Sequence, residues 1–292
     1  RLTMRITMTT VPLNIVLNYV FMYGACGVPA FGGAGAGLGA ALSYCVNLVL
    51  NIVVTLRMAQ FRRYRVFSHL PRPALGTWRA LLAICVPIGL TVFCEQSIFG
   101  AVGLLMAAYG TTVLAAHQAA MNFTTIVYML PLSVSMAITI LVGYEIGGGR
   151  ESGARAYIRL SRVLTLLFVG IVALVLAAMR DTVAALYTTD PAVQELLQVF
   201  LLYALLMQFS DCVNAPLQGA LRGYKDVTVT FWLAVLSFWG IGLPSGYLLA
   251  QYTDLGPYGY WAGLIGGIVV GAVLLMIRLR IIEQRMRRAM QT

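Results

Sequence analysis

The feature that most constrains this chain is a series of eight apolar stretches, each roughly 17 to 30 residues long, the length that spans a bilayer. No water is available in the hydrocarbon core, so each stretch must satisfy its own backbone polar groups as an α-helix. We therefore predict an all-α, polytopic membrane protein. The expected spans are residues 6–23, 35–56, 80–108, 113–143, 163–179, 196–221, 227–250 and 259–277.

Composition excludes a water-soluble globular protein. Of the 292 residues, 60% are hydrophobic and only 10% are charged. Soluble domains carry roughly 25% charged residues, because their whole surface faces water. The lipid bilayer is therefore the expected environment of most of the surface.

The basic residues follow an alternating pattern along the chain. All of the 20 Lys and Arg residues except Arg180 lie before the first span, after the last span, or in alternate connections between spans. This positive-inside asymmetry places both termini of the chain in the cytoplasm. The net charge of +10 does not indicate nucleic acid as a partner, because no soluble basic surface is predicted.

Several kinds of chemistry lack their sequence motifs. The chain has no GxxxxGK[ST] phosphate loop and no HExxH, and its two histidines, His69 and His117, are too few for a His-rich metal site. The five cysteines show no CxxC spacing. We therefore expect them to be small buried residues rather than parts of a disulfide framework. We expect neither a bound cofactor nor an enzyme.

The two ends of the chain resemble each other. Each end reads as a helix, a Gly/Pro-rich turn, a Gly-rich helix and an arginine run, so that Gly35 pairs with Gly263 and Gly39 with Gly267. The chain also begins at Arg1 rather than Met. We expect a fragment of a twelve-helix, two-lobe transporter that lacks its first four helices. Residues 1–75 would then hold the last two helices of the N-terminal lobe and a cytoplasmic inter-lobe loop, and residues 76–292 the six-helix C-terminal lobe.

Two acidic residues lie deep inside predicted spans. Glu95 is midway along the third span and Asp211 is well inside the sixth. A charge at this depth costs roughly 2.5–3.5 kcal/mol, so such residues usually face the bundle interior and carry function. A buried carboxyl that only ties helices together is the alternative. We expect both residues to attract either a cation or a proton.

Polar residues at helical spacing accompany these carboxylates. Gln208, Asp211, Asn214 and Gln218 fall within one arc of the sixth span. On the fourth span, Gln118 and Asn122 recur one turn apart. We expect Asn122, Gln208 and Asn214 to contact substrate, although interhelical hydrogen bonding is the plainer explanation of such amides. The prolines inside spans are expected to kink their helices: Pro87, Pro131, Pro216 and Pro244.

Four segments resemble the multidrug and toxic compound extrusion (MATE) family of the MOP superfamily, in its NorM-like branch. They are PAFGGAGAGLG at 29–39, CVPIGL…E at 85–95, AAHQA…NF at 115–123 and GALRGYKD at 219–226. The resemblance covers nearly the whole chain in order. It implies that the chain corresponds to helices five to twelve of the twelve-helix fold.

The resemblance also implies a function and a set of site residues. Family members export cationic, amphipathic drugs in exchange for Na⁺ or H⁺. The positions that match the cation site of the NorM-like branch are Glu95, Tyr128 and Asp211, and the resemblance implies that Glu95 and Asp211 are ligands if the coupling ion is Na⁺. The positions that match those near the drug are Gln118 and Asp190. The resemblance also implies a protein of the bacterial inner membrane, and we expect the full-length protein to act as a monomer. The resemblance leaves the drugs and the choice between Na⁺ and H⁺ open.

Three other functions remain open on the sequence alone. A lipid-linked oligosaccharide flippase of the same superfamily would have a lumen rich in arginine, yet no Lys or Arg lies mid-span. An intramembrane enzyme would use Glu95 and Asp211 as an acid–base pair, but DDxxD and GxGD are absent. A purely structural membrane protein would not need the carboxylates at all.

Overall fold

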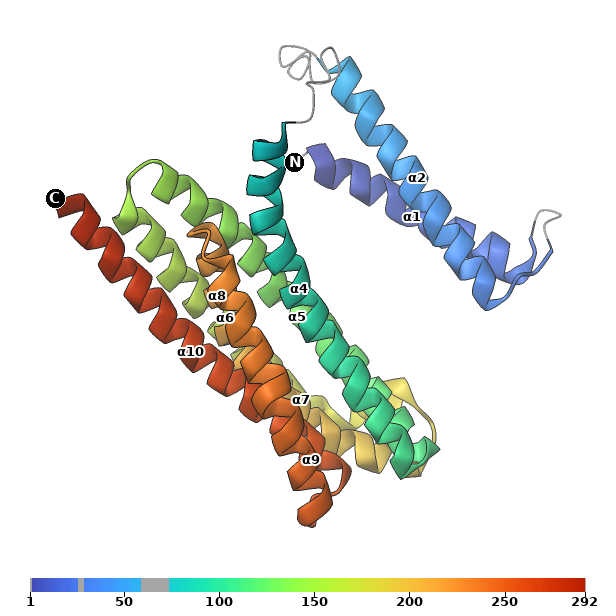
Figure 1. The fold of residues 1–292 in the computed structure, drawn as a ribbon. Helices are drawn as coiled ribbons and strands as arrows, with labels where there is room; N and C mark the ends of the chain where they lie inside the picture. The colour runs from blue at the N-terminus through green and yellow to red at the C-terminus, as the bar shows by residue number, and fades with distance from the viewer. Residues whose placement is uncertain (1, 26–28, 59–73, 292) are drawn as a thin grey trace. The chain divides into compact units, whose positions relative to one another are not determined.

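The structure, a computed structural model, describes residues 2–25, 29–58 and 74–291. Regular structure in these residues is entirely helical (Figure 1). The predicted inter-lobe loop falls largely on 59–73, outside the described residues, as do Cys26 and His69. The elements are α1 (Leu2–Tyr23), α2 (Gly33–Arg57), α4 (Leu75–Met106), η1 (Ala107–Tyr109), α5 (Thr111–Gly147), α6 (Glu151–Tyr187), α7 (Pro191–Gly223), α8 (Val227–Val235), η2 (Leu236–Gly242), α9 (Leu243–Tyr252) and α10 (Pro257–Gln291).

Eight helices within the described residues are long and apolar enough to cross a membrane, which confirms the predicted number of spans. Their outward surfaces are apolar: Ile140 is 72% exposed and Leu174 is 73% exposed. Such surfaces suit lipid rather than water. The largest differences from prediction are at the end of α10, which extends to Gln291 rather than to residue 277, and at the start of α6, which begins at Glu151 rather than at residue 163. Its early arginines are good helix formers, so the helix continues beyond the apolar stretch.

The chain divides into two compact units, Arg1–Ala74 and Leu75–Thr292. In the first unit α1 packs on α2. Glycines permit this close approach, because a Cβ atom at Gly35 would overlap the backbone of Phe21 and one at Gly39 would overlap Asn18. Asn47 Nδ2 also donates to Thr10 Oγ1 at 3.0 Å. The assignment of the two units to two transporter lobes stays a prediction.

The glycines that the repeat pairs with these two play the same part in the second unit. A Cβ atom at Gly263 on α10 would overlap the backbone of Gly246 on α9, and one at Gly267 would meet Ser237 and Gly242. Both pairs of glycines therefore allow two helices to pack backbone to backbone. The shared packing supports the predicted internal repeat.

The contact between α5 and α7 is the most extensive in the second unit. Ser135 Oγ on α5 donates to the carbonyl of Ala215 at 2.7 Å, and Thr139 Oγ1 donates to the carbonyl of Gly219 at 3.0 Å. Gly219 itself lies against the Ser135 backbone with no room for a side chain. Small residues and interhelical hydrogen bonds of this kind hold helices together in lipid.

Pro216 shows how the bundle accommodates a proline inside a span. Proline has no N–H, so the carbonyl of Cys212, one turn earlier, loses its helical donor. Thr165 Oγ1 on α6 donates to that carbonyl at 2.8 Å. A neighbouring helix thus satisfies the freed group, as lipid requires.

The seventh span is not one continuous α-helix. It runs as α8, then the π-helical segment η2, then α9, with Pro244 in the first turn of α9. Pro244 again removes a backbone donor, and a π-helical segment is one way to absorb such a disruption. The sequence indicated a kink at this proline but not the π-helix.

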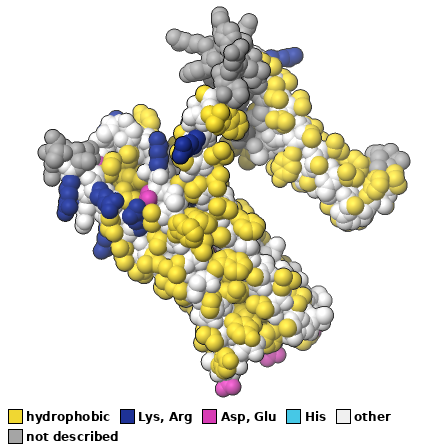
Figure 2. Space-filling view, viewed as in Figure 1, with side chains coloured by type: hydrophobic (Ala, Val, Ile, Leu, Met, Phe, Trp, Pro, Cys, Tyr) yellow, Lys and Arg dark blue, Asp and Glu magenta, His cyan; other side chains and the backbone are white. Residues whose placement is uncertain are grey.

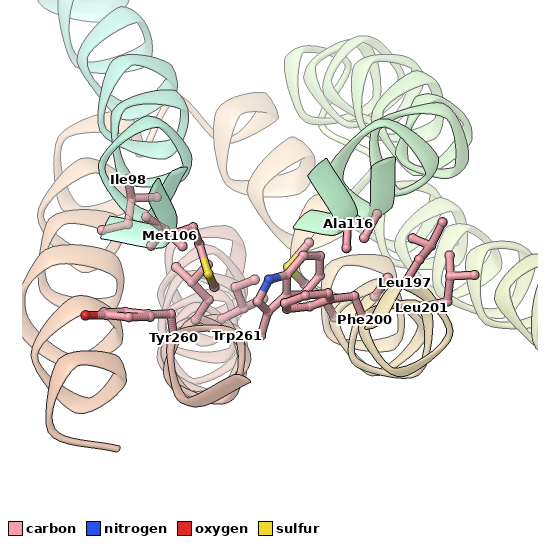
Figure 3. Packing of buried hydrophobic residues seen from close by; sticks show 14 of the residues in the cluster. Ile98, Met106, Ala116, Leu197, Phe200, Leu201, Tyr260 and Trp261 are labelled. Atoms are coloured by element: carbon pink, nitrogen blue, oxygen red, sulfur yellow. The ribbon is translucent and has the colours of Figure 1, made fainter. Parts of the chain in front are cut away.

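Aromatic side chains fill part of the core of the second unit (Figure 3). Trp261 of α10 is fully buried and packs on Phe200 of α7 with ring centroids 5.6 Å apart. Its Nε1 donates to Nδ1 of His117 on α5 at 3.1 Å. His117 therefore has a structural partner that joins α5 to α10.

Charged side chains of the second unit gather at its ends. Figure 2 shows Lys and Arg near the end of α10, apolar side chains along the middle, and Asp and Glu at the opposite end. The α7–α8 turn lies at the basic end, where Arg278 holds Asp226 through Nε–Oδ2 at 2.7 Å and Nη2–Oδ1 at 3.1 Å. A charged border around an apolar band is the pattern expected of a bilayer-spanning unit.

The glycine packing of α10 gives a matched pair of substitutions. Gly263→Ala places a methyl group on the α9 backbone, which should cost about 1–3 kcal/mol as overpacking does in other cores. Gly266→Ala lies on the same helix with nothing within 4 Å of the new atom. We expect only Gly263→Ala to lower the melting temperature of the detergent-purified protein. Equal melting temperatures for the two variants would contradict this packing.

Candidate functional site

A cavity of about 280 Å³ opens between helices of the second unit. α4, α5 and α7 supply most of its wall, and Phe238 of η2 closes one part of it. Apolar side chains and a few polar groups share the lining, as in many small-molecule sites. The lining residues are Glu95, Gln96, Phe99, Met121, Thr124, Thr125, Tyr128, Met129, Leu132, Met207, Asp211, Asn214, Ala215, Gln218 and Phe238.

Both membrane carboxylates face this cavity from different helices. Glu95 comes from α4 and Asp211 from α7, with Tyr128 of α5 beside them. All three side chains line the same cavity. The three residues predicted to bind the coupling ion are therefore brought together.

The two carboxylates differ in their protein partners. Glu95 Oε1 accepts a hydrogen bond from Gln218 Nε2 at 2.6 Å. Within the described residues, Asp211 has neither a hydrogen bond nor an ion pair from the protein. No Lys, Arg or His occurs among the described residues that line the cavity. The described lining of the cavity thus contains two acidic side chains and no basic one.

The donor set suits a monovalent hard cation better than a transition metal. The described residues contain no group of three or more His, Cys, Asp or Glu that could hold a metal ion. Oxygen atoms dominate instead: two carboxylates, the Tyr128 hydroxyl and Asn214. Asn214 Oδ1 is buried and has no hydrogen-bond partner in the described part of the chain. Such a set can coordinate Na⁺ or hold a proton.

The structure separates the predicted α7 stripe into two groups. Asp211, Asn214 and Gln218 line the cavity. Gln208 does not, because it is fully buried and its Nε2 donates to the carbonyl of Thr124 at 2.6 Å. That contact joins α7 to α5. A part for Gln208 in substrate binding stays a prediction.

The remaining predicted residues lie away from the cavity lining. Asn122 is exposed on α5 and accepts from the Tyr187 hydroxyl at 3.1 Å. Gln118 is also exposed. Asp190 caps α7, where its Oδ1 accepts from the backbone N–H of Ala192 at 2.9 Å, as an N-cap residue does. Their roles near the drug stay predictions.

Some lining residues carry no clear signal in the sequence. Gln96 follows Glu95 directly, and Gln218 belongs to the polar stripe, so both were within reach of sequence reasoning. Met129, Leu132 and Phe238 are ordinary apolar residues by sequence, and only the packing of the helices places them on the cavity. The contribution of Phe238 also depends on the π-helical geometry of η2.

Sequence comparison identifies relatives along almost the whole chain. A sequence model of the MatE family matches residues 87–248. The chain is 47% identical over 286 residues to "Probable multidrug resistance protein NorM" of Oceanobacillus iheyensis, covering 98% of this chain and 64% of that protein. It is also 47% identical to the protein of the same name from Bacillus subtilis, covering 98% and 63%. The chain therefore spans less than two thirds of the length of these relatives.

Solved structures show the same fold at lower identity. The eukaryotic MATE transporter AtDTX14 superposes with a TM-score of 0.87 at 19% identity, covering 98% of this chain and 63% of its own. The Vibrio cholerae MATE transporter VcmN in its bent form superposes with a TM-score of 0.76 at 19% identity, covering 97% and 62%.

These comparisons bear out three predictions. The all-α fold is that of MATE transporters. The relatives and structural neighbours are named as multidrug resistance proteins and transporters, in agreement with the prediction that this protein is not an enzyme. The match to the family model covers more than half of the chain. By these findings, this chain belongs to the MatE family.

Proposed function

We propose that this chain forms part of a secondary multidrug exporter, which moves cationic, amphipathic drugs out of the cell in exchange for Na⁺ or H⁺. The observation that carries the proposal is the cavity that Glu95 and Asp211 share, with no basic side chain among its described lining residues. The names of the relatives support the drug class. The two acidic side chains of the cavity wall support the proposal that the cargo is positively charged.

The mechanism follows from the cost of negative charge in a low dielectric. A carboxylate there is stabilised by a cation or by a proton. A drug cation and the coupling ion therefore compete for Glu95 and Asp211, and binding of one favours release of the other. Phe99, Met121 and Phe238 offer apolar and aromatic surface to the body of an amphipathic drug. Rocking between two conformations then turns the competition into export.

The flippase alternative is less well supported by this wall. An oligosaccharide attached to lipid phosphate needs positive groups, and phosphate recognition is usually the work of Arg or Lys. One structural neighbour, a MOP superfamily transporter of Pyrococcus furiosus, is described by a pocket of reverse polarity that suggests a different function. The acidic wall of the present cavity favours cations.

We also propose the setting in which the exporter works. The relatives named NorM are bacterial, and the basic end of the second unit (Figure 2) supports a cytoplasmic location for that end. The protein would thus lie in the inner membrane with both termini of this chain in the cytoplasm. A monomer is sufficient in this proposal, because the cavity lies within one chain.

The first test removes each carboxylate charge with little change in shape. In the full-length protein, Glu95→Gln and Asp211→Asn should each lower drug efflux at least tenfold, because each removes one of the two carboxylates that attract cations to the cavity. The measurement is ethidium uptake into inside-out proteoliposomes with Na⁺ and pH gradients imposed separately. Asp254→Asn, an exposed acid in the α9–α10 turn, is the matched control. Wild-type efflux in both cavity variants would refute the proposal.

The second test concerns the orientation of the chain. A reporter that fluoresces only in the cytoplasm, fused after residue 291, should be active, and a reporter inserted between Asp254 and Leu255 should be inactive. The physical reason is the arginine run at the end of α10. The opposite pair of signals would contradict the proposed topology.

A further inference from the structure

Gln218 joins the cavity to a basic residue outside it. Its Nε2 donates to Glu95 Oε1 at 2.6 Å, and its Oε1 accepts from Arg222 Nη2 at 3.1 Å. A carboxylate only accepts hydrogen bonds and a guanidinium only donates them, so both contacts require the same orientation of the amide. Glu95, Gln218 and Arg222 therefore form one directed hydrogen-bond chain.

The α5–α7 contact holds this chain in place. Residues on either side of Gln218 are fixed to α5, since Ser135 donates to the Ala215 carbonyl and Thr139 to the Gly219 carbonyl. Gln218 is itself only 6% exposed. Its amide thus has little freedom to turn away from Glu95, a rigidity that suits a group whose task is to position another.

Arg222 supplies a positive charge that the cavity wall lacks. Its guanidinium is linked to Glu95 through the amide of Gln218. Glu95 thus has a partial internal counter-charge, whereas Asp211 has no such link within the described residues. Cys94, Tyr128 and Asp211 are the other titratable groups that face Glu95 or lie beside it.

We propose that Gln218 and Arg222 are positioning residues that weaken the hold of Glu95 on a visiting cation and so set the rate of its release. The inference rests on the proposed function and adds to it a named control of affinity. A transport site must bind its cargo and also let it go. The positive charge of Arg222, linked to Glu95 through Gln218, keeps the cavity from binding its cargo too tightly to release it.

We expect substitutions of Gln218 and Arg222 to raise the affinity for ethidium and to lower the maximal rate of its transport. Gln218→Met keeps the length of the side chain but removes both hydrogen bonds, and Arg222→Gln removes the charge. Each variant should bind ethidium about tenfold more tightly and lower its maximal transport rate by a similar factor, because the carboxylate loses a charge-assisted partner. Arg222→Lys restores the charge and should stay within about threefold of the wild type.

The experiment uses the full-length protein in proteoliposomes. Ethidium binding is followed by fluorescence, and KM and the maximal rate are obtained from uptake. Gln251→Met, at an exposed position on α9, is the matched control and should change neither constant. A merely structural role for Gln218 would weaken binding or leave it unchanged, and Arg222→Lys would then behave like Arg222→Gln.

The outcomes separate the two proposals. If Glu95→Gln weakens ethidium binding while Gln218→Met and Arg222→Gln weaken it too or leave it unchanged, the positioning role is overturned and the exporter stands. If Glu95→Gln and Asp211→Asn both bind and transport ethidium like the wild type, the exporter itself is overturned. Tighter binding with slower transport in Gln218→Met and Arg222→Gln, reversed in Arg222→Lys, supports both.

Discussion

The cost of placing a carboxylate inside a bilayer-spanning bundle is the constraint on which the rest of this structure depends. Glu95 and Asp211 each carry that cost, and the fold directs both into one cavity rather than toward lipid. One of the two has a hydrogen-bond partner in Gln218, and the other has none within the described residues. Two carboxylates with so few protein partners are stabilised when a cation or a proton from outside the protein binds to them.

The scaffold that presents this pair is built from small contacts between helices. Hydroxyls of α5 bind carbonyls of α7, Gly219 removes the bulk between the two backbones, and Thr165 compensates for the proline in α7. These contacts fix the rotation of α7, which decides that Asp211 and Gln218 face the cavity while Gln208 faces α5. The proposed function therefore depends on backbone packing as much as on the charged groups themselves.

The sequence was informative where a single residue type carries a high energetic cost inside the membrane. Hydrocarbon thickness predicted the spans, and the rarity of charge in lipid singled out Glu95 and Asp211. It was less informative where the role of a residue depends on its neighbours in space. The side-chain amide of a residue such as Gln208 can hydrogen-bond either to a substrate or to a backbone carbonyl. Only the packing of α5 on α7 shows that Gln208 donates to the carbonyl of Thr124. Asp190 likewise caps α7, a contact that was not predicted from the sequence. The sequence also shows no pattern that predicts the π-helical η2, which brings Phe238 to the cavity wall.

The central claim is that drug and coupling ion occupy the same pair of carboxylates in turn. Calorimetric titration of the purified full-length protein with tetraphenylphosphonium, repeated over a range of Na⁺ concentrations and of pH, tests this claim most directly. Competition predicts that Na⁺ or H⁺ raises the apparent Kd linearly with the concentration of the ion. A Kd that stays constant across both series would show that the ion and the drug bind independently, and would contradict the account.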